Sequence, residues 1–124
     1  MIKVLLVEDE ALHLMYLKRL FQVSGFEVTG AVASATMAME SVNNQVPDVA
    51  VFDINLNNTL DGIELARKLR EQFSFPIVFV SGYDDPVTAA RRSKIAQSLS
   101  LSKPVAENKL MEAIHQLLED QTLT

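Results

Sequence analysis

Five polar residues of this sequence stand at or just after the ends of short apolar runs, where β-strands are expected to end. They are Glu8, Asp9, Asp53, Ser81 and Lys103. Three carboxylates held within a few ångströms of one another repel strongly, and proton uptake or a bound cation relieves that repulsion. Oxygen ligands without histidine or cysteine suit a hard ion, and a few carboxylates completed by water suit Mg²⁺ better than Ca²⁺. If the five residues converge, their types predict a magnesium site.

Asp53 is the residue for which this set suggests a reaction. A carboxylate can act as a nucleophile and form an acyl phosphate. Magnesium with a nearby lysine and hydroxyl stabilises a transferring phosphoryl group. We therefore expect Asp53 to attack a phosphoryl donor, while Mg²⁺ and Lys103 neutralise the phosphoryl oxygens and Ser81 donates a hydrogen bond to them. Taken alone, Asp53 would be expected to hydrogen-bond its own loop, and Glu8 and Asp9 to cap a following helix.

The elements that must position these residues are predicted by apolar runs that alternate with stretches of helical periodicity. The expected strands are 2–7, 26–32, 49–53, 77–80 and the less apolar 97–101, and the expected helices are 11–24, 34–42, 63–73, one from 86 and one from 104 to 118. Runs that are apolar at successive positions suit strands buried on both faces. Regular alternation predicts a parallel sheet with helices on both sides. Ligands of such sheets bind at the carboxyl ends of the strands, near the switch in strand order.

Single residues mark several of the expected helix ends. Gly25 suits the left-handed backbone that ends a helix, Ser34 is an expected N-cap, and Asp85-Pro86 supplies an N-cap followed by proline at the first helical position. The apolar stripe that predicts the first helix consists of Leu12, Met15, Tyr16, Leu20 and Val23. His13 and His115 lie on separate expected helices without a metal-binding spacing, so we expect exposed or half-buried side chains.

The composition of the chain excludes several classes of protein and of binding site. The 124 residues are 48% hydrophobic and 22% charged, which suits one domain; we expect it to span 1–121, followed by a frayed tail at 122–124. The net charge of −5 and the scattered basic residues argue against a nucleic-acid interface. The absence of cysteine excludes disulfides, thiolate catalysis and cysteine-bound zinc. No stretch resembles a signal peptide or a membrane span, so a cytoplasmic protein without membrane contact is expected.

The order and spacing of these motifs resemble the receiver domain of two-component response regulators. The resemblance extends from Lys3 to about Leu118 and rests on Glu8-Asp9, Asp53, Asp61-Gly62, Ser81 and Lys103-Pro104. It implies an α/β flavodoxin-like fold of three layers, with a doubly wound five-stranded parallel sheet in the order 2-1-3-4-5. It also implies a signalling switch that takes its phosphoryl group onto Asp53 from a histidine kinase or phosphotransfer protein.

The resemblance also implies ligands and partners. Mg²⁺ would be bound by Asp9, Asp53 and the main-chain carbonyl of Asn55, with Glu8 often acting through water. The Lys103-Pro104 peptide bond would be cis. A downstream protein target is expected, and the family allows a homodimer through the fourth helix, fifth strand and fifth helix. The chain would catalyse only its own phosphorylation and dephosphorylation, so we do not expect a true enzyme.

Two other functions compete with this interpretation. A Mg²⁺-dependent phosphohydrolase of the haloacid-dehalogenase type could use Asp53 as its nucleophile, but it would need a second aspartate two residues later, where this sequence has Asn55. A flavin-binding protein of the same fold would need a serine-, threonine- or glycine-rich phosphate loop after the first strand. The acidic run from Glu8 to Glu10 would instead repel a phosphate. The receiver interpretation is therefore favoured.

Three departures from the family pattern concern the loops and the output face. The loop after Asp53 is longer than the common form and carries Asn57-Asn58 in place of the usual proline, and Ala96-Gln97 replaces a common Gly-Ala pair. Ser100 stands where the family usually has Tyr or Phe, three residues before the lysine. We expect weaker coupling between phosphorylation and the output face, which is the surface formed by the fourth helix, fifth strand and fifth helix. Alternatively, another residue takes the place of the aromatic ring, and Tyr83 is the candidate.

Overall fold

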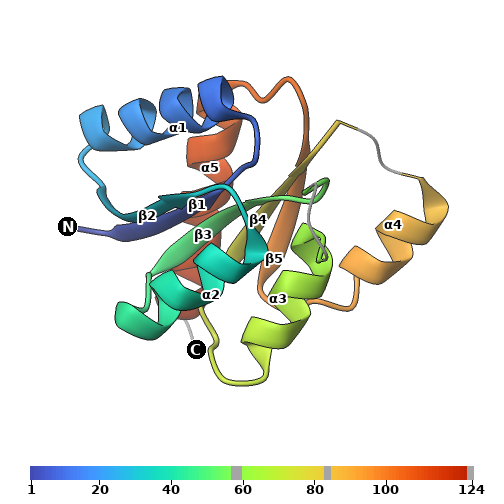
Figure 1. The fold of residues 1–124 in the computed structure, drawn as a ribbon. Coiled ribbons are helices and arrows are strands. Elements are labelled where there is room, and N and C mark those ends of the chain that lie inside the picture. The colour runs from blue at the N-terminus through green and yellow to red at the C-terminus, as the bar shows by residue number, and fades with distance from the viewer. Residues whose placement is uncertain (57–59, 83–84, 123–124) are drawn as a thin grey trace.

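Strands and helices alternate along the chain in the computed structural model, which describes residues 1–56, 60–82 and 85–122 (Figure 1). The strands are β1 (Lys3–Val7), β2 (Glu27–Val32), β3 (Val49–Asp53), β4 (Ile77–Ser81) and β5 (Ser98–Ser102). The helices are α1 (Ala11–Val23), α2 (Ala35–Asn44), α3 (Gly62–Arg70), α4 (Pro86–Arg92) and α5 (Glu107–Thr122). Each expected element is present, with ends shifted by a few residues.

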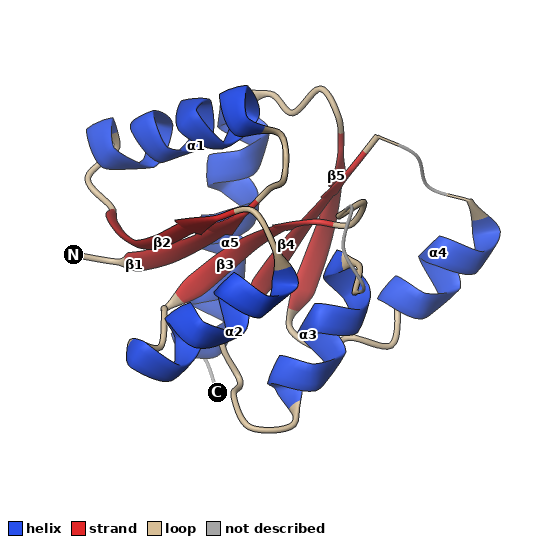
Figure 2. Cartoon of the chain, in the orientation of Figure 1, coloured by secondary structure: helices blue, strands red, loops and turns tan. Residues whose placement is uncertain are grey.

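The sheet has the strand order β2-β1-β3-β4-β5, and every neighbouring pair is parallel (Figure 2). The predicted fold class, a doubly wound flavodoxin-like sheet, is confirmed. Because β1 lies between β2 and β3, the strand order switches between β1 and β3. Ligands of doubly wound sheets bind at the carboxyl ends of the strands beside this switch.

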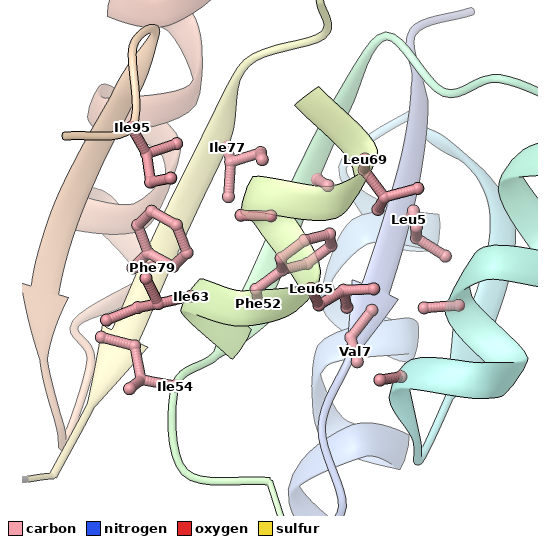
Figure 3. Close-up of a cluster of buried hydrophobic side chains, with 14 of the residues drawn as sticks. Leu5, Val7, Phe52, Ile54, Ile63, Leu65, Leu69, Ile77, Phe79 and Ile95 are labelled. Carbon is pink, nitrogen blue, oxygen red and sulfur yellow. The ribbon is translucent and has the colours of Figure 1, made fainter. Parts of the chain in front are cut away.

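Side chains along β1, β3 and β4 alternate between two hydrophobic cores, one on each face of the sheet. The strand residues of the first core, under α2 and α3, include Leu5, Val7, Ala50, Phe52, Ile77 and Phe79 (Figure 3). Those of the second core, under α1 and α5, include Val4, Leu6, Val49, Val51, Val78 and Val80. Both faces of the central strands are thus covered, which explains why these strands are apolar at successive positions.

Local capping residues act as predicted. The Ser34 hydroxyl accepts a hydrogen bond from the Met37 N–H, and the Asp85 carboxylate accepts one from the Thr88 N–H. Gly25 follows α1 with a φ of 88°, a conformation that glycine adopts at little cost.

At the other end of the chain α5 continues through Thr122, one residue past the expected boundary, and 123–124 lie outside the described residues. No helix within the described residues combines the length and hydrophobicity needed to cross a membrane.

The buried side of α1 differs from the stripe that predicts this helix. Leu17 and Phe21 are buried, and Leu14 and Leu20 pack against the same core. The other four stripe residues are exposed: Leu12 (77%), Met15 (67%), Tyr16 (45%) and Val23 (64%). Apolar residues surround most of α1, so the periodicity identifies a helix without fixing which side faces the sheet.

Ion pairs, rather than burial, attach α4 to its neighbours. None of its residues, all of which the structure describes, is buried, and Figure 1 shows α4 set apart from the sheet beside α3. A guanidinium nitrogen of Arg91 lies 2.9 Å from Asp61 Oδ2 and 3.7 Å from Glu64 Oε1. Asp61 Oδ1 also accepts a hydrogen bond of 2.8 Å from the Glu64 N–H. One carboxylate therefore caps α3 and holds α4.

Gly62 fixes the start of α3 close to the end of β3, and its replacement by alanine is expected to destabilise the protein. A Cβ at this position would collide with the main-chain oxygen of Asp53 and lie 3.0 Å from the Ile54 Cα. Because backbone atoms cannot move aside cheaply, we expect Gly62→Ala to lower the free energy of unfolding by about 2 kcal/mol in urea denaturation. Gly82→Ala is the matched control, since no atom of the described residues lies within 4 Å of a Cβ built there. Equal effects of the two substitutions would contradict this account.

Candidate functional site

The polar residues at the strand ends meet at the carboxyl edge of the sheet, beside the switch in strand order. Glu8, Asp53 and Ser81 are buried, with exposed fractions of 1%, 4% and 3%. Lys103, which follows β5, places its Nζ 3.0 Å from Glu8 Oε1 and 3.2 Å from Asp53 Oδ2. Two buried carboxylates thus share one ammonium.

The loop after β3 surrounds the Asp53 carboxylate. The Asn55 N–H donates a hydrogen bond of 3.0 Å to Asp53 Oδ1, and the Asn55 side-chain amide lies 3.5 Å from Ser81 Oγ. Asn55 is itself exposed, so it lies at the solvent side of the site. The Lys103 N–H donates a hydrogen bond of 2.8 Å to the Ser81 carbonyl, and the Lys103-Pro104 peptide bond is cis, as expected. These contacts place a backbone amide and an ammonium on the Asp53 carboxylate, with the Ser81 hydroxyl beside the Asn55 side chain.

Glu8, Asp9 and Asp53 form a group that could hold a metal ion. Each offers one carboxylate oxygen, and these oxygens all lie within 4.8 Å of one another. Asp9 is partly exposed, whereas the other two are buried, so the group opens to solvent on the Asp9 side. Oxygen donors with a surplus of negative charge suit Mg²⁺, and the residues present therefore fit the ion.

Burial and mutual repulsion shift the pKa values of this group. Burial raises the pKa of Asp53 above its ordinary value, and the neighbouring Glu8 raises it further, although the Asn55 amide and Lys103 oppose the change. Burial alone would raise the pKa of Glu8, but its hydrogen bonds, above all those with Asp53 and His13, lower it. Burial alone would lower the pKa of Lys103, but the two carboxylates raise it. Of the two buried carboxylates, Asp53 is therefore the one whose negative charge is held less favourably.

The raised pKa of Asp53 predicts a pH-dependent gain of stability in Asp53→Asn. A carboxyl with a raised pKa in the folded state stabilises the fold while protonated, and this contribution is lost as the pH rises through that folded value. At about pH 7 the ionised Asp53 is therefore a destabilising charge, and we expect Asp53→Asn to raise the free energy of unfolding by about 1 kcal/mol. The gain should shrink as the pH falls toward the ordinary value of 3.8. Urea denaturation across this range tests the prediction, and a gain that grows toward acid pH would contradict it.

His13 contacts the site, and its role was not predicted from the sequence. Its Nδ1 donates a hydrogen bond to Glu8 Oε1, and its side chain is 24% exposed, within the half-buried range that was expected. The signal that could have identified it is its position on the first turn of a helix that begins directly after the acidic motif. Ser100, which is expected to weaken coupling to the output face, pairs with Phe79 in the register of β4 and β5 and is partly exposed. Its candidate substitute, Tyr83, and Asn57-Asn58 lie outside the described residues.

Comparison with known proteins gives matches over nearly the whole chain. A family model described as the response regulator receiver domain matches residues 4–115. The transcriptional regulatory protein BtsR of Salmonella typhi is 31% identical over 123 residues, which are 98% of this chain and 50% of that protein. The aerobic respiration control protein ArcA of Escherichia coli K12 is 30% identical over 93% of this chain and 48% of that protein. This chain thus spans about half the length of these relatives.

Solved structures of receiver domains also match the fold of this chain over nearly its whole length. A signal receiver domain of a modulated diguanylate cyclase from Desulfovibrio desulfuricans G20 matches with a TM-score of 0.88 and 31% identity, over 98% of this chain and 96% of that one. A CheY-like response regulator receiver domain protein from Methanospirillum hungatei JF-1 matches with a TM-score of 0.90 and 25% identity, over 98% and 97% of the two chains.

Proposed function

This chain belongs to the response regulator receiver domain family, and on that premise we propose that it is a signalling switch that accepts a phosphoryl group on Asp53. The observation that supports this proposal best is the position of Asp53, buried at the end of β3 with Lys103 Nζ 3.2 Å from its Oδ2. The ammonium lies where it can neutralise a phosphoryl group attached to this carboxylate. We propose residues 1–121 as the receiver unit, which includes the matched range 4–115.

The transfer itself needs few protein groups. A carboxylate oxygen of Asp53 attacks phosphorus, the bond from phosphorus to the donor's leaving atom breaks, and the leaving group keeps the electron pair. Lys103 and the Ser81 hydroxyl then hold the phosphoryl oxygens. Mg²⁺, held by Glu8, Asp9, Asp53 and the Asn55 carbonyl, would supply further neutralisation of charge when bound.

We propose a histidine kinase or a histidine phosphotransfer protein as the phosphoryl donor. The phosphorylated chain would then act on a downstream target protein. The named relatives are a transcriptional regulatory protein and a respiration control protein about twice as long as this chain. Two arrangements follow for this chain: a receiver acting by direct protein contact, or one that regulates a further domain.

Asn55 stands where an aspartate-nucleophile phosphatase carries its general acid, which supports a switch that catalyses only reactions of its own phosphoryl group.

Phosphorylation of the chain in vitro tests the proposal. We expect acetyl phosphate with Mg²⁺ to add one phosphoryl group, detected by intact mass, and chelation of the ion to prevent it. Asp53→Asn should abolish the adduct, whereas Asp48→Asn, at the opposite end of the sheet, should leave it unchanged. An adduct that persists in Asp53→Asn would overturn the assignment of the acceptor. Absence of any adduct, with a cognate kinase also tried, would overturn the proposed function.

Ser100 leads to a separate prediction about the readout. A serine at this position is too small to fill the space that the Ser81 hydroxyl would leave on moving toward a phosphoryl group. We therefore expect beryllofluoride, which mimics the phosphoryl group, to cause only small changes in the amide spectra of β5. Large shifts over Ser98–Ser102 in nuclear magnetic resonance spectra of the bound and free protein would contradict weak coupling.

A further inference from the structure

The Glu8 carboxylate has nearly all of its acceptor sites occupied. Oε1 accepts hydrogen bonds from Lys103 Nζ, at 3.0 Å, and from His13 Nδ1. Oε2 accepts a hydrogen bond of 3.2 Å from the Glu10 N–H. A carboxylate offers about four such sites, so these donors leave a single site toward the neighbouring acidic groups. The orientation of Glu8 is therefore fixed by three donors from three directions.

The ring of His13 is itself held in place. It stacks against Tyr16, one turn further along α1, with ring centroids 6.3 Å apart and ring planes 11° apart. The Tyr16 hydroxyl donates a hydrogen bond to Glu107 Oε1 at the start of α5. Because an ionised carboxylate can only accept, the His13 Nδ1 that faces Glu8 carries a proton. His13 is thus a donor held in place through α1 and α5.

Lys103 cannot hold Glu8 throughout the reaction. Its ammonium is a flexible point charge that also contacts Asp53, and the proposed function requires it to bind the phosphoryl oxygens. Glu8 is 1% exposed, and a buried carboxylate that loses its partners is strongly unfavourable. When Lys103 turns toward the phosphoryl group, His13 and the Glu10 N–H are the donors from outside the carboxylate group that still hold Glu8.

We propose that His13 is a positioning residue that keeps Glu8 oriented toward the carboxylate group formed with Asp9 and Asp53, so that this group binds Mg²⁺ tightly. The inference rests on the proposed function, because it concerns the ion on which phosphoryl transfer to Asp53 would depend. Hydrogen-bonding partners of ligating groups commonly contribute 10–100-fold to metal affinity.

Magnesium titration by isothermal calorimetry tests the role of His13. We expect His13→Leu to weaken Mg²⁺ binding by about tenfold. His13→Asn should restore most of the affinity, because its amide nitrogen lies close to the position of the imidazole Nδ1. His115→Leu is the matched control: His115 lies on α5 with its ring 6.4 Å from Phe26, and its loss should leave the affinity unchanged. Raising the Mg²⁺ concentration should also restore phosphorylation of His13→Leu by acetyl phosphate.

Equal Mg²⁺ affinity in the wild type and His13→Leu would overturn the inference, and so would an asparagine variant that binds no better than the leucine variant. If His13→Leu fails to fold, His13→Gln replaces it, because its amide is one bond further out and misses the Nδ1 position. The inference then requires His13→Asn to bind Mg²⁺ more tightly than His13→Gln does. A wild-type chain that binds no Mg²⁺ would instead overturn the proposed function, and this inference with it.

Discussion

Replacing Lys103 by methionine is expected to lower the free energy of unfolding by about 3 kcal/mol at neutral pH. The ammonium lies 3.0 Å from Glu8 Oε1 and 3.2 Å from Asp53 Oδ2, and these two side chains are only 2% and 4% exposed. Methionine keeps the length of the side chain but removes the charge, so two buried carboxylates lose a shared partner. Urea denaturation monitored by circular dichroism measures the loss.

Lys109→Met is the matched control for this prediction. Lys109 is exposed on α5, so its replacement should change the free energy of unfolding by less than about 0.5 kcal/mol. The cost of Lys103→Met should also fall at acid pH, because Asp53, whose pKa is raised by burial, becomes protonated and no longer needs a cation. A cost that is the same for both lysines, or that grows toward acid pH, would contradict the role of Lys103 as a shared partner.

Magnesium is expected to stabilise the wild-type protein, and Asp9→Ala is expected to abolish this effect. An ion that binds only the folded state stabilises it by about 2.7 kcal/mol at a hundredfold excess over its dissociation constant. For a domain of this size the change corresponds to a rise in Tm of roughly 10 °C. Asp9 supplies one of the three oxygens that lie within 4.8 Å of one another, so its removal leaves a group too small to hold the ion.

Thermal unfolding followed with and without Mg²⁺ tests the role of Asp9. Asp48→Asn is the control, since Asp48 accepts a hydrogen bond from the Lys3 N–H at the opposite edge of the sheet and is expected to keep the full rise in Tm. A Mg²⁺ response that survives in Asp9→Ala would remove this residue from the proposed ligand set.

The order of the elements and the polar residues at the strand ends can both be predicted from the sequence alone. A strand that is buried on both faces must be apolar at successive positions, so β3 and β4 are visible as runs that end at Asp53 and Ser81. Caps depend on neighbouring residues alone, and Ser34 and Asp85 therefore cap α2 and α4 as predicted. The parallel topology then sends Glu8, Asp53 and Lys103 to one edge, because all strands of such a sheet point the same way.

Two features depend on packing in three dimensions: which side of a helix is buried, and which side chains from different elements meet. The apolar residues around α1 allow more than one buried face, and packing on the sheet selects the one with Leu17 and Phe21. The contact between His13 and Glu8 depends on the angle at which α1 leaves β1, and the ion pair of Arg91 with Asp61 depends on the path of α4. In each of these contacts, the residues next to a side chain in the sequence do not indicate which distant residue it will meet. The sequence therefore identifies the groups of the site, and the three-dimensional packing determines what holds them in place.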